Sequence, residues 1–109
     1  GFDSVGTDYD VVTAAAEAPL DIARRAAELM ELAREVTEIG NAAAASDGAC
    51  AAQALSAAVW CATYNGESSA AALKDPAKAQ TLRDEVSALR AHAEALLDAT
   101  NVAFGARLG

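Results

Sequence analysis

Apolar residues recur along this chain at intervals of three and four positions, which is the spacing of one face of an α-helix. The pattern predicts four helices, over residues 8–17, 19–39, 47–65 and 76–104, after a frayed lead-in of residues 1–7. We find no segment with the alternation typical of a β-strand. We therefore expect an all-α protein, an antiparallel bundle of about four helices in one domain spanning residues 1–109.

Residues that commonly start or stop helices separate these segments. Proline disfavours helical geometry in the residue before it and suits the first turn of a new helix. Serine, aspartate and asparagine cap helix starts, and glycine and asparagine often end helices. These rules place the boundaries at Ala18–Pro19, Gly40–Asn41, Ser46 or Asp47, the turn from Asn65 to Ser69, and Asp75–Pro76.

The last segment is the longest and the most regular. Its apolar positions alternate spacings of four and three, a heptad seam with Leu97 beside it. At 1.5 Å per residue, a helix over residues 76–104 would be about 43 Å long and would overhang a small monomer. The seam comprises Leu82, Val86, Leu89, Ala93, Leu96 and Thr100.

The apolar content of 53% overstates the size of the core, because 31 of the apolar residues are alanines. Alanine favours helices but buries little area. The nearly uncharged segment over residues 47–65 is expected at the centre of the bundle. Because the core has so little bulk, we expect a second copy of the chain to cover the remaining apolar faces of the helices. We therefore predict a homo-oligomer, specifically a dimer.

Composition also excludes several classes of partner. The formal net charge is −8 and the basic residues are scattered, which disfavours nucleic acid. No apolar run approaches the roughly 20 residues that span a bilayer, and no leader pattern stands at the start, so we expect no membrane partner and a cytoplasmic location. Cys50 and Cys61 would lie about 16 Å apart on one helix, and we expect reduced, half-buried thiols.

General chemical motifs are scarce. The sequence has no glycine-rich phosphate loop, no Ser/His/Asp set and no metal-ligand spacing. Its one histidine, His92, is expected on the surface. The polar stretch over residues 38–48 has two interpretations: a loop that aims amides and a carboxylate at a small ligand, or simply the caps of two helices.

Three runs in the chain resemble a known family. They are Glu17-Ala-Pro-Leu20, Ala33-Arg-Glu-Val-Thr-Glu-Ile-Gly-Asn41 and Ser46-Asp47. Together they are similar to the formiminotransferase-cyclodeaminase and methenyltetrahydrofolate cyclohydrolase family, whose pattern reads approximately E-V-P-L, A-E-I-G-N-P-N-A-x-S-D-A-G, L-N-V-R-I-N and L-K-D. Without a gap, Asn65 falls on the first asparagine of the third motif, and Leu73-Lys74-Asp75 falls on the last.

The chain also departs from that pattern. Ala42-Ala43 replaces P-N, Gly48-Ala49 replaces A-G, and residues 66–69 replace V-R-I-N. The family's glycine-rich P-T-P-G-G-G-S-type loop, which is implicated in folate binding, has no counterpart. The chain thus resembles the C-terminal part of a cyclodeaminase domain.

The resemblance implies hydrolysis of 5,10-methenyltetrahydrofolate or loss of ammonia from formiminotetrahydrofolate, without a metal or other cofactor. A carboxylate that accepts a proton from water and faces the cationic substrate suits this chemistry. Asp47 is the expected catalytic residue, and Asn41, Ser46 and Asn65 are the expected substrate-binding residues. The alternatives are a non-catalytic helical assembly domain and a truncated fragment of the family.

Overall fold

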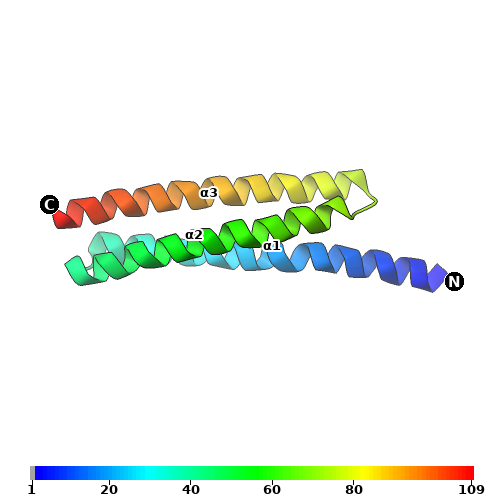
Figure 1. Cartoon of the computed structure of the whole chain (residues 1–109), viewed down its shortest axis with the longest axis horizontal. Coiled ribbons are helices and arrows are strands. Elements are labelled where there is room, and N and C mark those ends of the chain that lie inside the picture. The colour runs from blue at the N-terminus through cyan, green and yellow to red at the C-terminus, as the bar shows by residue number, and fades with distance from the viewer. Residues whose placement is uncertain (1) are drawn as a thin grey trace.

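Three long helices make up the protein, and they run antiparallel in chain order (Figure 1). The computed structural model describes the backbone of residues 2–109 and the side chains of residues 14–109. The helices are α1 (Phe2–Ile39), α2 (Ala42–Ala71) and α3 (Pro76–Leu108), and the bundle measures 66 × 18 × 15 Å. The all-α prediction is confirmed, but the prediction of four helices is wrong, because residues 2–109 form three.

The expected break at Ala18–Pro19 is absent, since α1 continues through both residues. The predicted lead-in is also helical from Phe2 onward, while Gly1 lies outside the described residues. Pro19 removes one helical hydrogen bond. Buried residues on either side of it, Ala16 and Leu20, belong to one hydrophobic cluster and are both fully inaccessible to solvent. Packing of these two residues therefore holds the helix together across the proline.

The second predicted boundary lies earlier than expected. Asn41, and not Ser46 or Asp47, caps α2, because its Oδ1 atom accepts a hydrogen bond of 2.9 Å from the backbone N–H of Ala44. Only Gly40 and Asn41 separate α1 from α2. The four alanines that follow Asn41 are strong helix formers. Ser46 and Asp47 consequently lie inside the helix.

The turn predicted from Asn65 to Ser69 is also wrong, since α2 continues to Ala71. Gly66 is buried, and a Cβ atom there would lie 3.0 Å from Cδ2 of Leu20 and 3.7 Å from Cγ2 of Val86. The glycine therefore allows α1 and α3 to approach α2 closely, and it does not reverse the chain.

The start of α3 agrees with the prediction. Asp75 caps the helix by accepting a hydrogen bond of 2.9 Å from the backbone N–H of Ala77, and Pro76 occupies the first turn. Five of the six predicted seam residues are buried and the sixth, Leu89, packs against both hydrophobic clusters. The heptad seam is therefore the inner face of α3.

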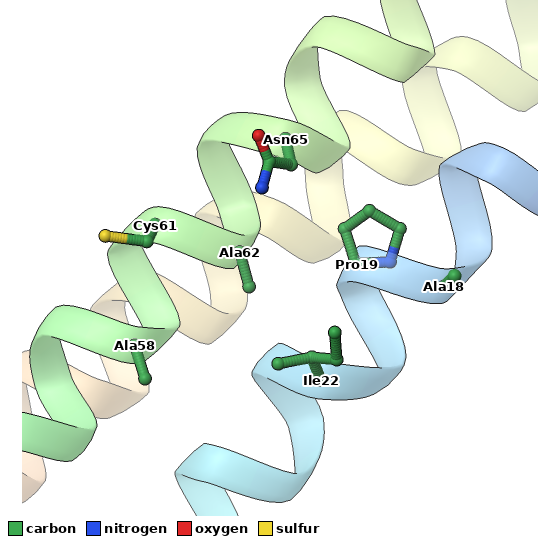
Figure 2. Close-up of a pocket in the computed structure, with 7 residues that line it drawn as sticks. All are labelled: Ala18, Pro19, Ile22, Ala58, Cys61, Ala62 and Asn65. Carbon is green, nitrogen blue, oxygen red and sulfur yellow. The ribbon is translucent and has the colours of Figure 1, made fainter.

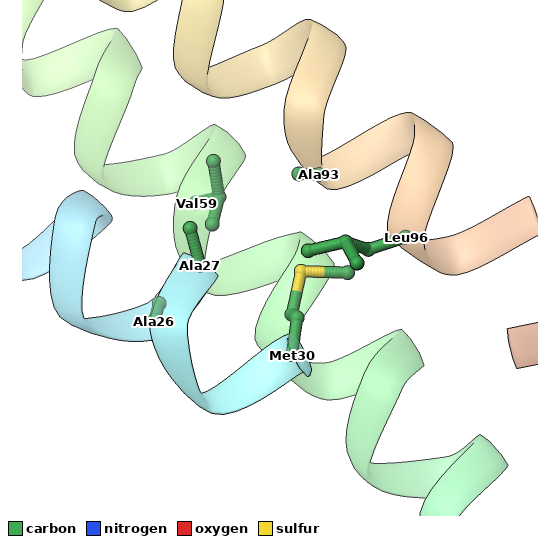
Figure 3. Close-up of a cluster of buried hydrophobic side chains, with 6 residues drawn as sticks. All are labelled: Ala26, Ala27, Met30, Val59, Ala93 and Leu96. Carbon is green, nitrogen blue, oxygen red and sulfur yellow. The ribbon is translucent and has the colours of Figure 1, made fainter. Parts of the chain in front are cut away.

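Two adjoining hydrophobic clusters fill the interior. One of them joins all three helices through Met30, Val59 and Leu96 (Figure 3). Its other buried members are alanines, so the helices approach closely and little volume is enclosed. The second cluster surrounds Leu20, Leu82 and Val86 nearer the N-terminal half of α1.

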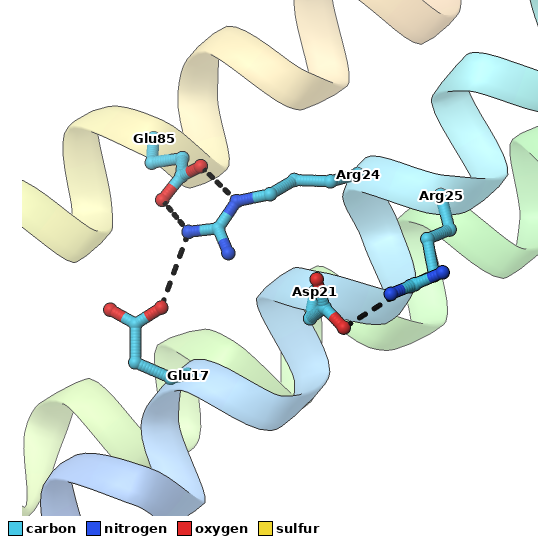
Figure 4. Close-up of polar contacts among 5 residues, drawn as sticks. All are labelled: Glu17, Asp21, Arg24, Arg25 and Glu85. Carbon is cyan, nitrogen blue, oxygen red and sulfur yellow. Dashed lines mark hydrogen bonds and ion pairs between the residues drawn. The ribbon is translucent and has the colours of Figure 1, made fainter.

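An ion-pair cluster ties α1 to α3 beside the second hydrophobic cluster. Arg24 donates two hydrogen bonds of 2.5 Å to the carboxylate of Glu85, and a third of 3.3 Å to Glu17 (Figure 4). The bond from Arg24 holds the pKa of Glu85 below its ordinary value, against burial, which raises it. A planar guanidinium paired in this two-bond manner fixes both distance and orientation.

The outer side of α1 is apolar and exposed. We call Ile22, Leu29, Leu32, Val36 and Ile39 the α1 stripe; these side chains are between 43% and 80% exposed. The prediction that the segment over residues 47–65 lies at the centre of the bundle is wrong, because α2 also has an exposed side beside this stripe. In a bundle of three helices, none is surrounded by the others.

Candidate functional site

Three of the four predicted site residues lie where α1 meets α2. Asn41 is exposed, and its side-chain oxygen is occupied in capping. Ser46 and Asp47 are exposed on the second turn of α2. The expected polar loop over residues 38–48 is thus only Gly40 and Asn41. Asn41 has a capping role, but it caps the start of α2, which the sequence had assigned to Ser46 or Asp47.

Asp47 lies at the rim of an apolar groove between α1 and α2. Leu32 and Val36 from α1 line the groove, together with Leu55 from α2, and its volume is about 360 Å³. Next to Asp47, Gly48 is buried against α1, where a Cβ atom would lie 2.9 Å from the carbonyl oxygen of Ala33. The close approach of the helices at Gly48 therefore holds the Asp47 carboxylate at the edge of the groove.

Asn65 lies far from the other three residues within the chain. It is 18 residues after Asp47 on the same helix, which corresponds to five turns and about 27 Å. Because the separation is a whole number of turns, both side chains leave the same side of α2. Asn65 borders a second groove of about 380 Å³, where Pro19 and Ile22 face α2 (Figure 2).

A polar cluster between α2 and α3 was only partly predicted. Trp60 and Tyr64 lie on one side of α2, as their spacing of four indicates, with ring centroids 5.9 Å apart. The guanidinium of Arg90 lies 4.5 Å from the first centroid and 4.9 Å from the second. It also donates hydrogen bonds to Thr63 Oγ1 at 2.9 Å and to Glu67 at 2.6 Å. Nothing in the sequence pattern linked Arg90 to this pair.

The remaining candidate side chains are on the surface. His92 is exposed, as predicted, and its Nε2 atom lies 3.2 Å from Glu31. Cys50 and Cys61 are free thiols, but both are exposed and not half-buried as predicted. Both lie on α2.

We find no group of three or more histidine, cysteine, aspartate or glutamate side chains that could hold a metal ion among the described residues. Over the same part of the chain, no helix has the length and hydropathy to cross a bilayer.

Comparison with known proteins finds one matching family. Residues 9–88, which are 80 of the 109 residues, match the formiminotransferase-cyclodeaminase family. No curated protein and no solved structure matches the chain. The matched region contains Asn41, Ser46, Asp47 and Asn65, and it ends within α3. This match and the motifs around Asp47 lead to one conclusion: the chain belongs to the formiminotransferase-cyclodeaminase family.

Proposed function

We propose that this protein acts, in the cytoplasm and as a homodimer, on a one-carbon derivative of tetrahydrofolate. The reaction is hydrolysis of 5,10-methenyltetrahydrofolate or loss of ammonia from formiminotetrahydrofolate. The observation that carries the proposal is the family match over residues 9–88, because it includes the acidic residue that such chemistry requires.

Asp47 is proposed as the catalytic carboxylate. Its exposed position leaves it accessible to both water and substrate. In the hydrolysis, the carboxylate accepts a proton as water adds to the methenyl carbon, and its negative charge favours the cationic substrate. The bond from that carbon to N5 then breaks as the carboxylic acid returns the proton to N5, and the adduct's hydroxyl proton is released to water, which leaves a formyl group on N10. The adjacent apolar groove offers a surface for a flat ring system, as ligand sites commonly do.

The other three residues are proposed to bind substrate. Asn65 carries an amide that can both donate and accept hydrogen bonds, which suits the edge of a pterin. Asn41 has its side-chain NH₂ group for the same purpose while its oxygen caps α2. Ser46 lies beside Asp47 and can orient water through its hydroxyl.

The test is an assay of 5,10-methenyltetrahydrofolate hydrolysis, followed by the loss of its near-ultraviolet absorbance. The Asp47→Asn variant preserves shape and removes the charge, so we expect turnover to fall by about 10²-fold or more. Glu94→Gln, which neutralises an exposed carboxylate on α3, is the matched control and should retain full turnover. Equal rates for Asp47→Asn and the unmodified protein would refute the assignment.

A second candidate function is a non-catalytic assembly domain. Two observations favour it: the capping role of Asn41 and the exposed α1 stripe. Titration with a folate analogue separates the two functions. Saturable binding at micromolar concentration supports the folate enzyme, whereas no binding at high micromolar concentration supports the assembly domain.

A further inference from the structure

The substrate of the proposed function has an anionic end for which the four proposed site residues offer no positive charge. A tetrahydrofolate carries a glutamyl tail, whose carboxylates lie at the end of the molecule away from the pterin. The chain itself has a formal net charge of −8. Because the average field of so acidic a protein repels an anion, the tail needs a cation close to the site. The question is which arginine or lysine shares a face with Asp47.

Only one of the two helices around Asp47 can supply that cation. The groove beside Asp47 lies between α1 and α2. The α2 helix contains no arginine or lysine along its whole length from Ala42 to Ala71. The α1 helix contains three, Arg24, Arg25 and Arg34. The candidates for binding the tail are therefore these three arginines.

Two of the three arginines face away from the groove. Arg24 turns towards α3, where it donates two hydrogen bonds to the carboxylate of Glu85 (Figure 4). Arg34 pairs with Glu38 at 3.0 Å. Nine residues separate Arg34 from Arg25, which is two and a half helical turns, so these two side chains leave opposite sides of α1. Arg25 is the arginine on the side of the α1 stripe.

Arg25 lies in line with the α1 stripe and is available to a ligand. It follows Ile22 by three residues and precedes Leu29 by four, which is the spacing of neighbours on one helix face. Its side chain is 74% exposed, and its Nε atom donates a hydrogen bond of 3.2 Å to Asp21 (Figure 4). Exposed pairs of this kind contribute little to stability. A substrate carboxylate can therefore displace Asp21 or bind the Nη side of the guanidinium beside it.

The groove of about 360 Å³ leads from Asp47 along α1 towards Arg25. Val36, Leu32 and Leu29 line it, and Leu29 is one turn from Arg25. The levels of Val36 and Arg25 on α1 differ by 11 residues, which is about 16 Å. In the substrate, a flat aminobenzoyl ring separates the reacting carbon from the glutamyl carboxylates. The groove thus has a negative charge, an apolar wall and a positive charge in the order in which the substrate has a cation, a ring and an anion.

From this order we propose that Arg25 binds the glutamyl carboxylates of the folate substrate and so selects substrates that carry the tail. The inference rests on the proposed function, because the cationic carbon placed at Asp47 sets the direction of the substrate. The reverse direction would bring the carboxylates to Asp47, where like charges repel. Arg25 does not touch the reacting atoms, so it acts on affinity and specificity and leaves the chemical step unchanged.

Steady-state kinetics of 5,10-methenyltetrahydrofolate hydrolysis test this role. Arg25→Gln removes the charge, so we expect KM to rise by about tenfold or more while kcat stays within about twofold. Arg25→Lys keeps the charge and should recover part of the affinity. Arg34→Gln is the matched control, because it removes an arginine from a similar pair on the opposite side of α1, and its KM should not change. An unchanged KM in Arg25→Gln, or an equal rise in both glutamine variants, overturns the inference.

A substrate without the tail gives a readout that a merely structural role would not produce. In the methylamide of 5,10-methenyltetrahydropteroate, the glutamate is replaced by a neutral group while the pterin, the reacting carbon and the ring are kept. The unmodified protein should show a KM for this amide about tenfold higher than for the glutamyl substrate, and Arg25→Gln should raise it no further. A further rise in KM for the amide would mean that Arg25 shapes the groove, and it would refute the contact with the tail.

Binding without turnover separates this inference from the proposed function. Calorimetric titration compares tetrahydrofolate, which lacks the reacting carbon, with the methylamide of tetrahydropteroate. If tetrahydrofolate binds more tightly than the amide and Arg25→Gln abolishes the difference, the tail contact stands even in a protein that hydrolyses nothing, and only the proposed function fails. Normal hydrolysis with equal affinity for the two ligands leaves the proposed function standing and refutes the tail contact. No binding of either ligand refutes both.

Discussion

A single methyl group added at Gly48 should destabilise the protein, although the same change usually stabilises a helix. Replacing glycine by alanine inside an exposed helix gains roughly 0.5–1 kcal/mol. At Gly48, however, a Cβ atom would lie 2.9 Å from the carbonyl oxygen of Ala33 and 3.2 Å from the backbone nitrogen of Thr37, and it would overlap the Thr37 hydroxyl. Two of these three neighbours are backbone atoms, which cannot rotate away.

The size of the effect follows from what must move. Thr37 is fully buried, and its hydroxyl donates a hydrogen bond of 2.8 Å to the carbonyl oxygen of Ala33. Rotating the hydroxyl away costs about 1 kcal/mol for that bond. Separating α1 from α2 instead costs about 1–3 kcal/mol in lost packing. The two backbone neighbours leave separation as the main remedy, at a cost of about 2–3 kcal/mol in the upper half of that range. After a gain of about 1 kcal/mol in helix propensity is subtracted, Gly48→Ala should cost about 1–2 kcal/mol.

Thermal unfolding by circular dichroism at fixed protein concentration measures this difference. For a domain of this size, 1 kcal/mol shifts Tm by about 4–8 °C, so Gly48→Ala should lower Tm by about 5–15 °C. Gly105→Ala is the control, because a Cβ atom at Gly105 meets nothing within 4 Å. That variant should keep Tm or raise it slightly. A rise in Tm for both variants would refute the close approach of α1 and α2 at Gly48.

Two further predictions concern the interior and the ion-pair cluster. Met30 is fully buried, so Met30→Ala should lower the free energy of unfolding in urea by about 2–4 kcal/mol; a loss below about 1 kcal/mol would contradict its place in the core. Glu85→Gln should cost about 0.5–1 kcal/mol at neutral pH, a small value because Arg24 and Glu85 are each about one-third exposed. Since Arg24 lowers the pKa of Glu85 in the folded state, this stabilisation is present above the ordinary glutamate pKa and is lost as the pH falls through the lowered value. Urea unfolding of both proteins at neutral pH and at about pH 3 should show the gap narrowing in acid, and a gap that widens would contradict the assignment.

The sequence predicted those parts of the fold in which local preference and packing agree. The start of α3 combines a capping aspartate with proline in the first turn, and its seam residues have the regular spacing of a buried face. Both features are present in the structure. The helical class and the inner face of α3 could therefore be obtained without coordinates.

The errors occurred where tertiary packing overrode a local signal. Pro19 and Gly66 are residues that commonly end helices, yet each lies inside one. Leu20, next to the proline, is buried in the second hydrophobic cluster, and it also packs against Gly66. One buried leucine thus accounts for much of both errors, and such a contact between residues 46 positions apart has no signature in the local pattern.

The candidate site was predictable in composition but not in arrangement. Motif resemblance identified Asp47 and Asn65, and both lie within the region that matches the family. The predicted helix over residues 47–65 already implies their separation along α2. It did not include the start of α2 at Ala42, which replaces the predicted polar loop and puts Ser46 and Asp47 inside the helix. About 27 Å separates the two residues on one helix, so they can share a site only across the proposed homodimer.

The two-residue connection between α1 and α2 has a consequence for how the chain folds. Helices joined by so short a link pair with little loss of chain entropy, so contacts between them can form early. Contacts between α1 and α3 join residues about 60 positions apart, as Arg24 and Glu85 do, and must wait for a larger loop to close. The link between α2 and α3 is also short, at four residues, but α1 and α2 cross closely at Gly48, so we expect these two helices to form the folding nucleus and α3 to dock afterwards.

Rate measurements would reveal this order. A destabilising change within the α1–α2 hairpin, such as Gly48→Ala, should mainly slow refolding, whereas one at the α3 interface, such as Leu96→Ala, should mainly speed unfolding. The close helix crossing at Gly48 would then determine how fast the protein reaches its native state as well as how stable that state is.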